Sequence, residues 1–258
     1  MAASAAVAKH YETATCRARA LYRIPTAPNS NRTLELHHAR ASLLSDFAWP
    51  GTHTSCLLDI GNSLQPGATP VPPATPGGNR CHANYRDPLP FANSSFDLVV
   101  LHRTLDDLAN ASRQIGQVFD SAAFLERVAQ VLVPSGLVAG CVDNLAGLKS
   151  LVRRAKQLTR RSKAIPAALH FTLGSIRTLL NAGSFSDVRT FTLLPSCADP
   201  LRLIDTDPKV SRIAFRHELQ IARQTWSHPG YLARRLAVEL GIYPDLEESI
   251  FFWAYKRC

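Results

Sequence analysis

Short apolar runs alternate along the chain with segments whose apolar residues recur at helical spacing. Apolar runs of roughly four to eight residues bounded by turn residues are typical of buried strands. The strands are expected at 55–61, 96–101, 137–141, 188–194 and 250–255. One helix is expected after Asp120 or Ser121, either of which can cap it, and another over 173–181. This alternation predicts an α/β protein with an open, mostly parallel sheet and helices on both faces.

Two further parts of the chain are expected to be helical additions to this sheet. Residues 1–50 read as helical segments broken by prolines, and they predict an N-terminal helical cap. Residues 51–258 are expected to form the main domain. Within it, helical patterns over about 196–248 predict a helical insertion between the last two strands.

Positive charge is concentrated in one stretch of the chain. The formal net charge is +9, and residues 144–186 contain eight lysines and arginines but no acidic residue. Residues 148–163 predict an amphipathic basic helix with Arg153 and Arg154 on its charged face. Such a face attracts an anionic small molecule or the surface of an anionic membrane, and a solvated helix face explains the charge equally well. Nucleic acid is disfavoured, because no aromatic residues are interleaved with the basic ones.

The cysteines and the hydropathy pattern bear on metal binding and on location. Six cysteines are scattered without a CxxC spacing or a tight Cys/His cluster, so the sequence predicts neither a metal site nor a disulfide framework. No apolar run reaches the roughly 18 residues that a membrane span needs. The expected location is therefore the reducing cytoplasm.

Five fragments resemble the successive signatures of one enzyme family. They are LLDIG at 57–61, LPFANSSFDLVVLHRTLDDL at 89–108, FLERVAQVLVPSGLV at 124–138, LGSIRTLLNAGSFSDV at 173–188 and FFWAYK at 251–256. Their order resembles that in class I S-adenosylmethionine-dependent methyltransferases of the small-molecule type. The resemblance implies a Rossmann-like fold, S-adenosylmethionine as the cofactor, and transfer of a methyl group to a small acceptor.

The same resemblance implies where the cofactor binds. Gly61 would let the backbone turn sharply after a first strand and approach the methionine half of the cofactor. The Leu-Pro-Phe segment would offer apolar surface to the adenine ring. Tyr85 stands where the family has an acid before that segment, and Asp87 is the nearest substitute. The implied cofactor-binding residues are Asp59, Gly61, Ser63, Asp87, Leu89, Pro90 and Phe91.

The acceptor is expected where the strands at 96–101 and 137–141 end. His102 follows the first of these strands as a candidate catalytic base, with Arg103 beside it, and Asn144 follows the second. Arg103 and Asn144, together with Arg153 and Arg154, are the expected substrate-binding residues.

The chain departs from the family pattern near the cofactor. Of the family's three alternating glycines only Gly61 is present, and prolines over 66–76 exclude the helix that usually follows. The segment from Gly61 to Leu89 is short, so the sheet is expected to be truncated around its second strand. Two functions therefore stay open. One is a methyltransferase for a small, anionic or carrier-linked acceptor, and the other is a catalytically inactive protein of the same fold that acts as a binding or scaffolding subunit. The sequence does not determine the oligomeric state.

Overall fold

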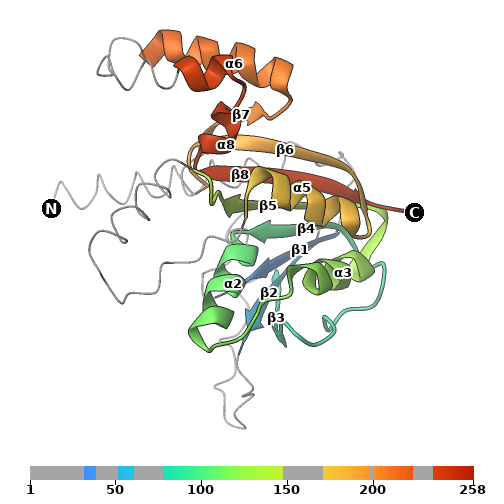
Figure 1. The fold of residues 1–258 in the computed structure, drawn as a ribbon. Coiled ribbons are helices and arrows are strands. Elements are labelled where there is room, and N and C mark those ends of the chain that lie inside the picture. The colour runs from blue at the N-terminus through green and yellow to red at the C-terminus, as the bar shows by residue number, and fades with distance from the viewer. Residues whose placement is uncertain (1–31, 39–51, 61–77, 148–170, 198–199, 223–234) are drawn as a thin grey trace, which may run out of the picture.

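An eight-stranded sheet runs through the molecule (Figure 1). The computed structural model describes residues 32–38, 52–60, 78–147, 171–197, 200–222 and 235–258. The strands are β1 (Arg32–His37), β2 (Thr52–Asp59), β3 (Gly78–Asn84), β4 (Phe96–His102), β5 (Leu132–Asp143), β6 (Phe185–Pro195), β7 (Pro200–Asp205) and β8 (Ser249–Lys256). Their order in the sheet is β3-β2-β1-β4-β5-β8-β6-β7. The first five in this order are parallel, whereas β8 is antiparallel to both of its neighbours and β7 to β6, which confirms the predicted mostly parallel α/β sheet.

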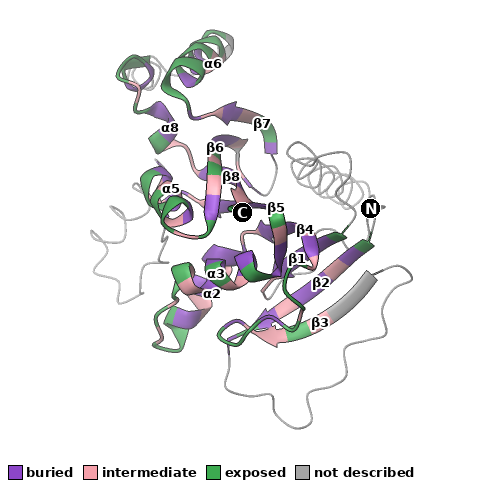
Figure 2. Ribbon diagram, turned by 90° about the vertical axis from the view of Figure 1, so that its right-hand side faces the viewer, coloured by how far each residue is buried: buried purple, intermediate pink, exposed green. Residues whose placement is uncertain are grey.

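Both faces of the central strands are buried. Along β4, Val99 and Leu101 belong to one hydrophobic core, and Leu98 and Val100 belong to a second core on the opposite face. A continuous apolar run predicts this two-sided burial. The helices α2 (Thr104–Gln114), α3 (Ser121–Val131) and α5 (Leu173–Ala182) lie on the first of these faces in both views (Figures 1 and 2).

Local capping signals set the start of two of these helices. The Asp120 side chain accepts a 3.0 Å hydrogen bond from Ala123 N, so this residue caps α3, and one of the two predicted caps is confirmed. Thr172 and Ser175 form a reciprocal capping box at the start of α5. Both helices therefore begin where side-chain oxygens satisfy the first amides.

Strand β1 is the main difference from the sequence-based prediction. It pairs with β2 on one side and β4 on the other, so residues 32–37 belong to the central sheet and not to a helical cap. Thr33 and Glu35 are buried on this strand, and the Glu35 carboxylate lies 3.4 Å from His53 of β2. These polar residues interrupt the apolar pattern that marks a buried parallel strand. The strand that ends at Asp59 is consequently the second strand along the chain, not the first as predicted. It is eight residues long.

The predicted insertion forms an arm beyond one edge of the sheet (Figure 1). It contains the helix α6 (Pro208–Ala222), a helical turn at 235–239 and the short helix α8 (Tyr243–Leu246), and α6 packs against the other two in a small core of their own. It also contains β7, an edge strand that the sequence analysis did not predict.

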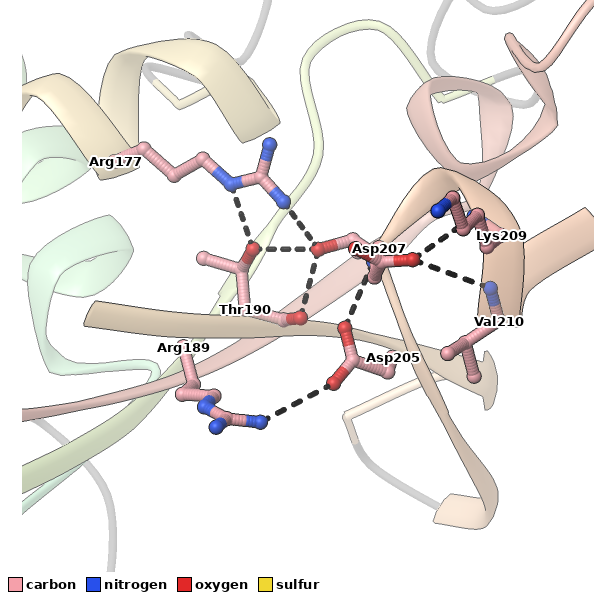
Figure 3. Close-up of polar contacts among 8 residues, drawn as sticks. Arg177, Arg189, Thr190, Asp205, Asp207, Lys209 and Val210 are labelled. Atoms are coloured by element: carbon pink, nitrogen blue, oxygen red, sulfur yellow. Dashed lines mark hydrogen bonds and ion pairs between the residues drawn. The ribbon is translucent and has the colours of Figure 1, made fainter. Parts of the chain in front are cut away.

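Polar contacts fasten the base of this arm (Figure 3). Arg177 of α5 donates hydrogen bonds to Thr190 Oγ1 of β6 at 2.8 Å and to Thr206 Oγ1 at 2.5 Å, and the two hydroxyl oxygens lie 2.6 Å apart. Asp207 Oδ1 then accepts a 2.9 Å hydrogen bond from Lys209 N and caps α6. These contacts join α5, the sheet and the arm at one place.

Several predicted site residues lie outside the described residues. They are Gly61, Ser63, the prolines over 66–76, and Arg153 and Arg154 of the basic stretch 148–163. In the part of the chain that the structure describes, no helix is long and apolar enough to cross a membrane. No group of three His, Cys, Asp or Glu side chains within that same part is placed to hold a metal ion.

Candidate functional site

The order of the strands marks where a ligand is expected. The chain passes from β1 to β2 and β3 on one side, whereas β4 and β5 lie on the other side of β1. In open α/β sheets, ligands bind outside the carboxyl ends of the strands at such a switch point. We call the ends of β1 to β5 the carboxyl edge. Its β1–β3 half ends in His37, Asp59 and Asn84, and its β4–β5 half ends in His102 and Asp143.

Two histidines hold the end of β1 against β2. His37 Nε2 lies 2.8 Å from Ser55 Oγ, and His38 Nδ1 lies 2.6 Å from the carbonyl oxygen of Leu58. The carbonyl oxygen of Leu36 accepts a buried 2.5 Å hydrogen bond from Thr104 Oγ1, at the start of α2. The end of β1 is thereby joined to β2 and to the helix that follows β4.

Asp59 ends β2 with an exposed side chain. Its Oδ1 accepts a 2.7 Å hydrogen bond from Ile60 N, and its carbonyl oxygen accepts one from Tyr85 N at 3.0 Å. The second bond holds the ends of β2 and β3 together. Asp59 follows the end of β1 by about 20 residues, the spacing at which α/β nucleotide sites place a carboxylate for ribose hydroxyls.

Tyr85 is buried in the core, with only 1% of the residue exposed. Its hydroxyl oxygen accepts hydrogen bonds from Arg86 Nε at 2.9 Å and from Ser112 Oγ at 3.3 Å. The position where the resemblance implies an acid therefore supplies a buried phenol and no carboxylate. Asp87 is exposed, in a turn that its own amide closes by a 3.1 Å hydrogen bond to Asn84 O.

The three residues that follow Asp87 and Pro88 differ in exposure. Leu89 is buried in the main core and so leaves little surface for a ligand. Pro90 is exposed, and Phe91 is half-buried with its ring edge-on to Phe96 at a centroid distance of 5.1 Å. Of the Leu-Pro-Phe segment, Pro90 and Phe91 are the residues that can present apolar surface to an adenine ring.

Arg103 of the β4–β5 half lies between the end of β4 and the start of α2. Its backbone has a left-handed conformation, with φ 60°. That conformation costs a residue with a side chain about 1 kcal/mol or more. The Arg103 Nη2 atom lies 2.6 Å from Asp143 Oδ2, and this ion pair joins the start of α2 to the end of β5. Burial acts to lower the pKa of Arg103, but the carboxylates of Asp143 and Asp106 oppose it, and the pKa is raised on balance.

Asp106 is a buried acid that the sequence analysis missed. It is only 2% exposed, and its Oδ2 accepts a 2.7 Å hydrogen bond from Asp143 N. Burial raises the pKa of Asp106 well above its ordinary value, and repulsion from the Asp143 carboxylate adds to the rise. The sequence signal is weak, because acids in the first turn of a helix are common and usually exposed.

Two buried polar atoms of this half have no hydrogen-bond partner within the described residues. They are Arg103 Nε, which is a donor, and Asp106 Oδ1, which is an acceptor unless protonated. The two side chains are close enough for the charge of each to shift the pKa of the other. Buried polar atoms are almost always paired, so this donor and acceptor mark a place where a further polar group can bind.

His102 ends β4 with its Nδ1 atom 3.3 Å from Cys141 Sγ of β5. Burial acts to lower the pKa of the His102 ring, but Cys141 and the Glu35 carboxylate favour the charged form, and the pKa is raised on balance. The His102 ring therefore holds a proton more readily than an ordinary imidazole, and imidazoles are the side chains that most often exchange protons near neutral pH.

Asn144 does not lie as the sequence analysis expects. It is fully buried, its Nδ2 donates to the carbonyl oxygens of Asp245 and Glu247 at 2.8 and 2.7 Å, and its Oδ1 accepts from Ala146 N at 3.1 Å. The amide thus fastens the end of β5 to the segment before β8. Because the chain itself uses these groups, the expectation that Asn144 faces a ligand is corrected.

The position of β1 also moves the expected cofactor turn. The family pattern of an acid followed by alternating glycines matches Glu35 in β1, followed at alternate positions by His37, Ala39 and Ala41. No glycine stands in that run. Asp59, which the sequence analysis placed before the glycine turn, instead ends the second strand along the chain.

Comparisons with known proteins agree with this architecture. No protein-family model matches the chain, and no curated protein matches it by sequence. A SAM-dependent methyltransferase from Archaeoglobus fulgidus is 14% identical with a TM-score of 0.51, and the match covers 95% of this chain and 94% of that one. One from Thermotoga maritima, described as a possible histamine N-methyltransferase, is 11% identical with a TM-score of 0.50, over 96% of this chain and 89% of that one. The protein therefore has the fold of class I SAM-dependent methyltransferases.

Proposed function

We propose that the protein is an S-adenosylmethionine-dependent methyltransferase for a small, anionic or carrier-linked acceptor. The observation that carries this proposal is the position of Asp59, an exposed carboxylate at the end of the second strand of a methyltransferase fold. A carboxylate at this place can accept hydrogen bonds from both hydroxyls of a ribose. The β1–β3 half is accordingly the proposed cofactor side.

The chain's own groups would position the reactants on this side. Bound S-adenosylmethionine supplies a methyl group on a sulfonium, so the protein contributes mainly orientation. Asp59 orients the ribose, while Pro90 and Phe91 present apolar surface to the adenine. Gly61, Ser63 and Asp87 stay sequence-based expectations for the same cofactor.

The β4–β5 half supports the acceptor side of the proposal. Arg103 Nε and Asp106 Oδ1 offer one donor and one acceptor to a polar group, and the Arg103 charge favours an anionic one. His102, whose pKa is raised, is the group that can take a proton from a hydroxyl or amine. Arg153 and Arg154 remain expected contacts for the anionic part of the acceptor.

A second function is favoured by one feature of the β1–β3 half. The run after Glu35 carries His37, Ala39 and Ala41 where the family pattern has glycines that let the backbone approach the cofactor. A protein with the same fold that no longer transfers methyl groups and serves as a binding subunit is consistent with this change.

Calorimetric titration of the purified protein with S-adenosylhomocysteine tests the proposal. Saturable binding, followed by transfer of labelled methyl from S-adenosylmethionine to a small-molecule fraction of cell extract, is the expected result. Binding without transfer to any component of the extract would favour the inactive subunit. No heat at millimolar ligand would overturn the assignment of the cofactor.

A further inference from the structure

Two cysteines face each other on neighbouring strands of the sheet. Cys56 of β2 and Cys81 of β3 are direct partners in the parallel register. Neighbouring strands lie about 4.8 Å apart, which falls within the Cα separation that a disulfide spans. Side chains at paired positions of parallel strands point to the same face, and both residues pack against the same core. Both are free thiols in this structure.

The two thiols differ in exposure. Cys56 is fully buried, whereas Cys81 is partly exposed on β3, the last strand at its edge of the sheet. The hydrogen bond between the two sulfurs lowers the pKa of Cys81, although burial acts in the other direction, and it raises the pKa of Cys56. Reactivity of a cysteine requires both the thiolate form and access for the reagent, and of these two thiols Cys81 is the more accessible and the one whose pKa is lowered.

We propose that Cys56 and Cys81 form a redox site that a hydroperoxide converts reversibly to a disulfide. The Cys81 thiolate attacks the peroxide oxygen that carries hydrogen, the O–O bond breaks, and the leaving alkoxide or hydroxide takes up the proton that the Cys81 thiol released, which gives the Cys81 sulfenic acid and an alcohol or water. The sulfur of Cys56 then attacks the sulfenic sulfur, the S–O bond breaks, and the thiol proton leaves with the hydroxyl as water. Two thiols and one hydroperoxide thus give one disulfide, one water and one alcohol or second water.

A second pair of sulfurs in the same molecule serves as an internal comparison. Cys141 of β5 and Cys197, which follows β6, share a hydrogen bond, but both residues are fully buried. Burial also raises the pKa of Cys197 well above its ordinary value. Proximity of two sulfurs is therefore common to both pairs, and only the first pair adds access for an oxidant.

The disulfide would fasten the edge strand β3 to β2 three residues before Asp59. It would close a loop of roughly 25 residues, which restricts the unfolded chain and raises the Tm of the oxidised protein by about 5–10 °C. This site does not depend on methyl transfer, and a protein that binds no cofactor would show the same chemistry.

The test is oxidation of the full-length protein with hydrogen peroxide, in a Cys258→Ser background that removes an exposed thiol. Remaining thiols are alkylated under denaturing conditions, and the peptides are mapped by mass spectrometry. The expected result is a linked Cys56–Cys81 peptide, with a higher Tm that dithiothreitol reverses. Cys81→Ser should abolish the link, whereas Cys141→Ser should leave it unchanged.

Two results would overturn the proposal. One is oxidised protein in which Cys81 carries a sulfinic acid or stays alkylatable while no linked peptide forms. The other is a Cys141–Cys197 link that forms as fast as the proposed one, because access would then not be the deciding property. If Cys81→Ser lowers the yield of folded protein, the rate of alkylation of Cys56 and Cys81 in the unoxidised parent protein decides, and Cys81 must react faster.

Discussion

The two halves of the carboxyl edge are held together by different kinds of interaction. In the β1–β3 half, hydrogen bonds that involve the His37 and His38 rings fasten the strand ends, and the Asp59 carboxylate stays exposed. In the β4–β5 half, the Arg103 guanidinium and the Asp106 carboxyl are buried or largely buried beside Asp143. Charged groups are costly to remove from water, so the β4–β5 half depends on keeping the partners of its buried groups, as Glu35 does deeper in β1, whereas the exposed Asp59 does not.

This difference separates two roles that a site residue can have. A change at an exposed side chain of the β1–β3 half, such as Asp59, removes ligand contacts but little that the folded chain needs. A change in the β4–β5 half leaves a buried charge without its partner and therefore affects stability and its pH dependence. Four measurements test this contrast.

The largest expected effect is that of Arg103→Met. Loss of the guanidinium leaves the Asp143 and Asp106 carboxyls without compensation, and the free energy of unfolding should fall by about 2–3 kcal/mol. Urea denaturation measures this change. Arg86→Met is the matched control in the other half, where Arg86 is exposed, and it should cost less than about 1 kcal/mol. Equal losses in the two variants would contradict the contrast.

Asp106→Asn should change how stability depends on pH. Because burial raises the pKa of Asp106 in the folded state, the folded protein holds a proton that the unfolded chain has already released. The Asp106 contribution to stability is therefore fully present below the ordinary pKa of an aspartate, about 3.9, and is lost as the pH rises through the folded-state pKa.

The neutral amide in Asp106→Asn removes this loss. The stability of the variant relative to the parent should thus rise with pH, and urea denaturation at a series of pH values measures this trend. Asp87→Asn removes an exposed carboxylate of the other half and should show no such trend. If the stability difference between Asp106→Asn and the parent does not change with pH, the pKa of Asp106 is the same in the folded and the unfolded protein.

Asp59→Asn should affect binding and not stability. Replacing one carboxylate oxygen by an amide nitrogen removes an acceptor for a ribose hydroxyl, and affinity for S-adenosylhomocysteine should fall about tenfold. Calorimetric titration measures the affinity, and thermal unfolding without ligand should show an unchanged Tm. Asp87→Asn is again the control. A larger effect of Asp87→Asn on affinity would shift the ribose site from β2 to the turn after β3.

The smallest expected effect lies outside both halves. Asp207→Ala removes the cap of α6 in the arm and should lower the free energy of unfolding by about 1 kcal/mol. Ligand affinity should not change, because Asp207 lies at the base of the arm that is tied to α5 and β6 (Figure 3), whereas the arm contacts the carboxyl edge through Asn144 and α8. A loss of affinity in this variant would show that the arm takes part in the site.

The local sequence pattern was sufficient to predict the helices and strands that tertiary packing also favours. The apolar runs at 96–101 and 250–255 are buried on both sides in β4 and β8, and Asp120 caps α3 as its side chain predicts. The five fragments resemble class I methyltransferases, and two solved methyltransferases that match this chain have the fold which that resemblance implies. In these segments, local preference and tertiary burial favour the same conformation.

Tertiary structure decided the features that depend on partners distant in sequence. Strand β1 was missed because it buries Glu35, which lies beside His53 of another strand, and no local pattern carries that information. The same holds for Asp106, whose burial depends on the end of β5, and for Cys81, whose partner is set by strand register. Composition and periodicity describe neighbours along the chain, whereas the chemistry of this site comes from residues that only the folded sheet brings together.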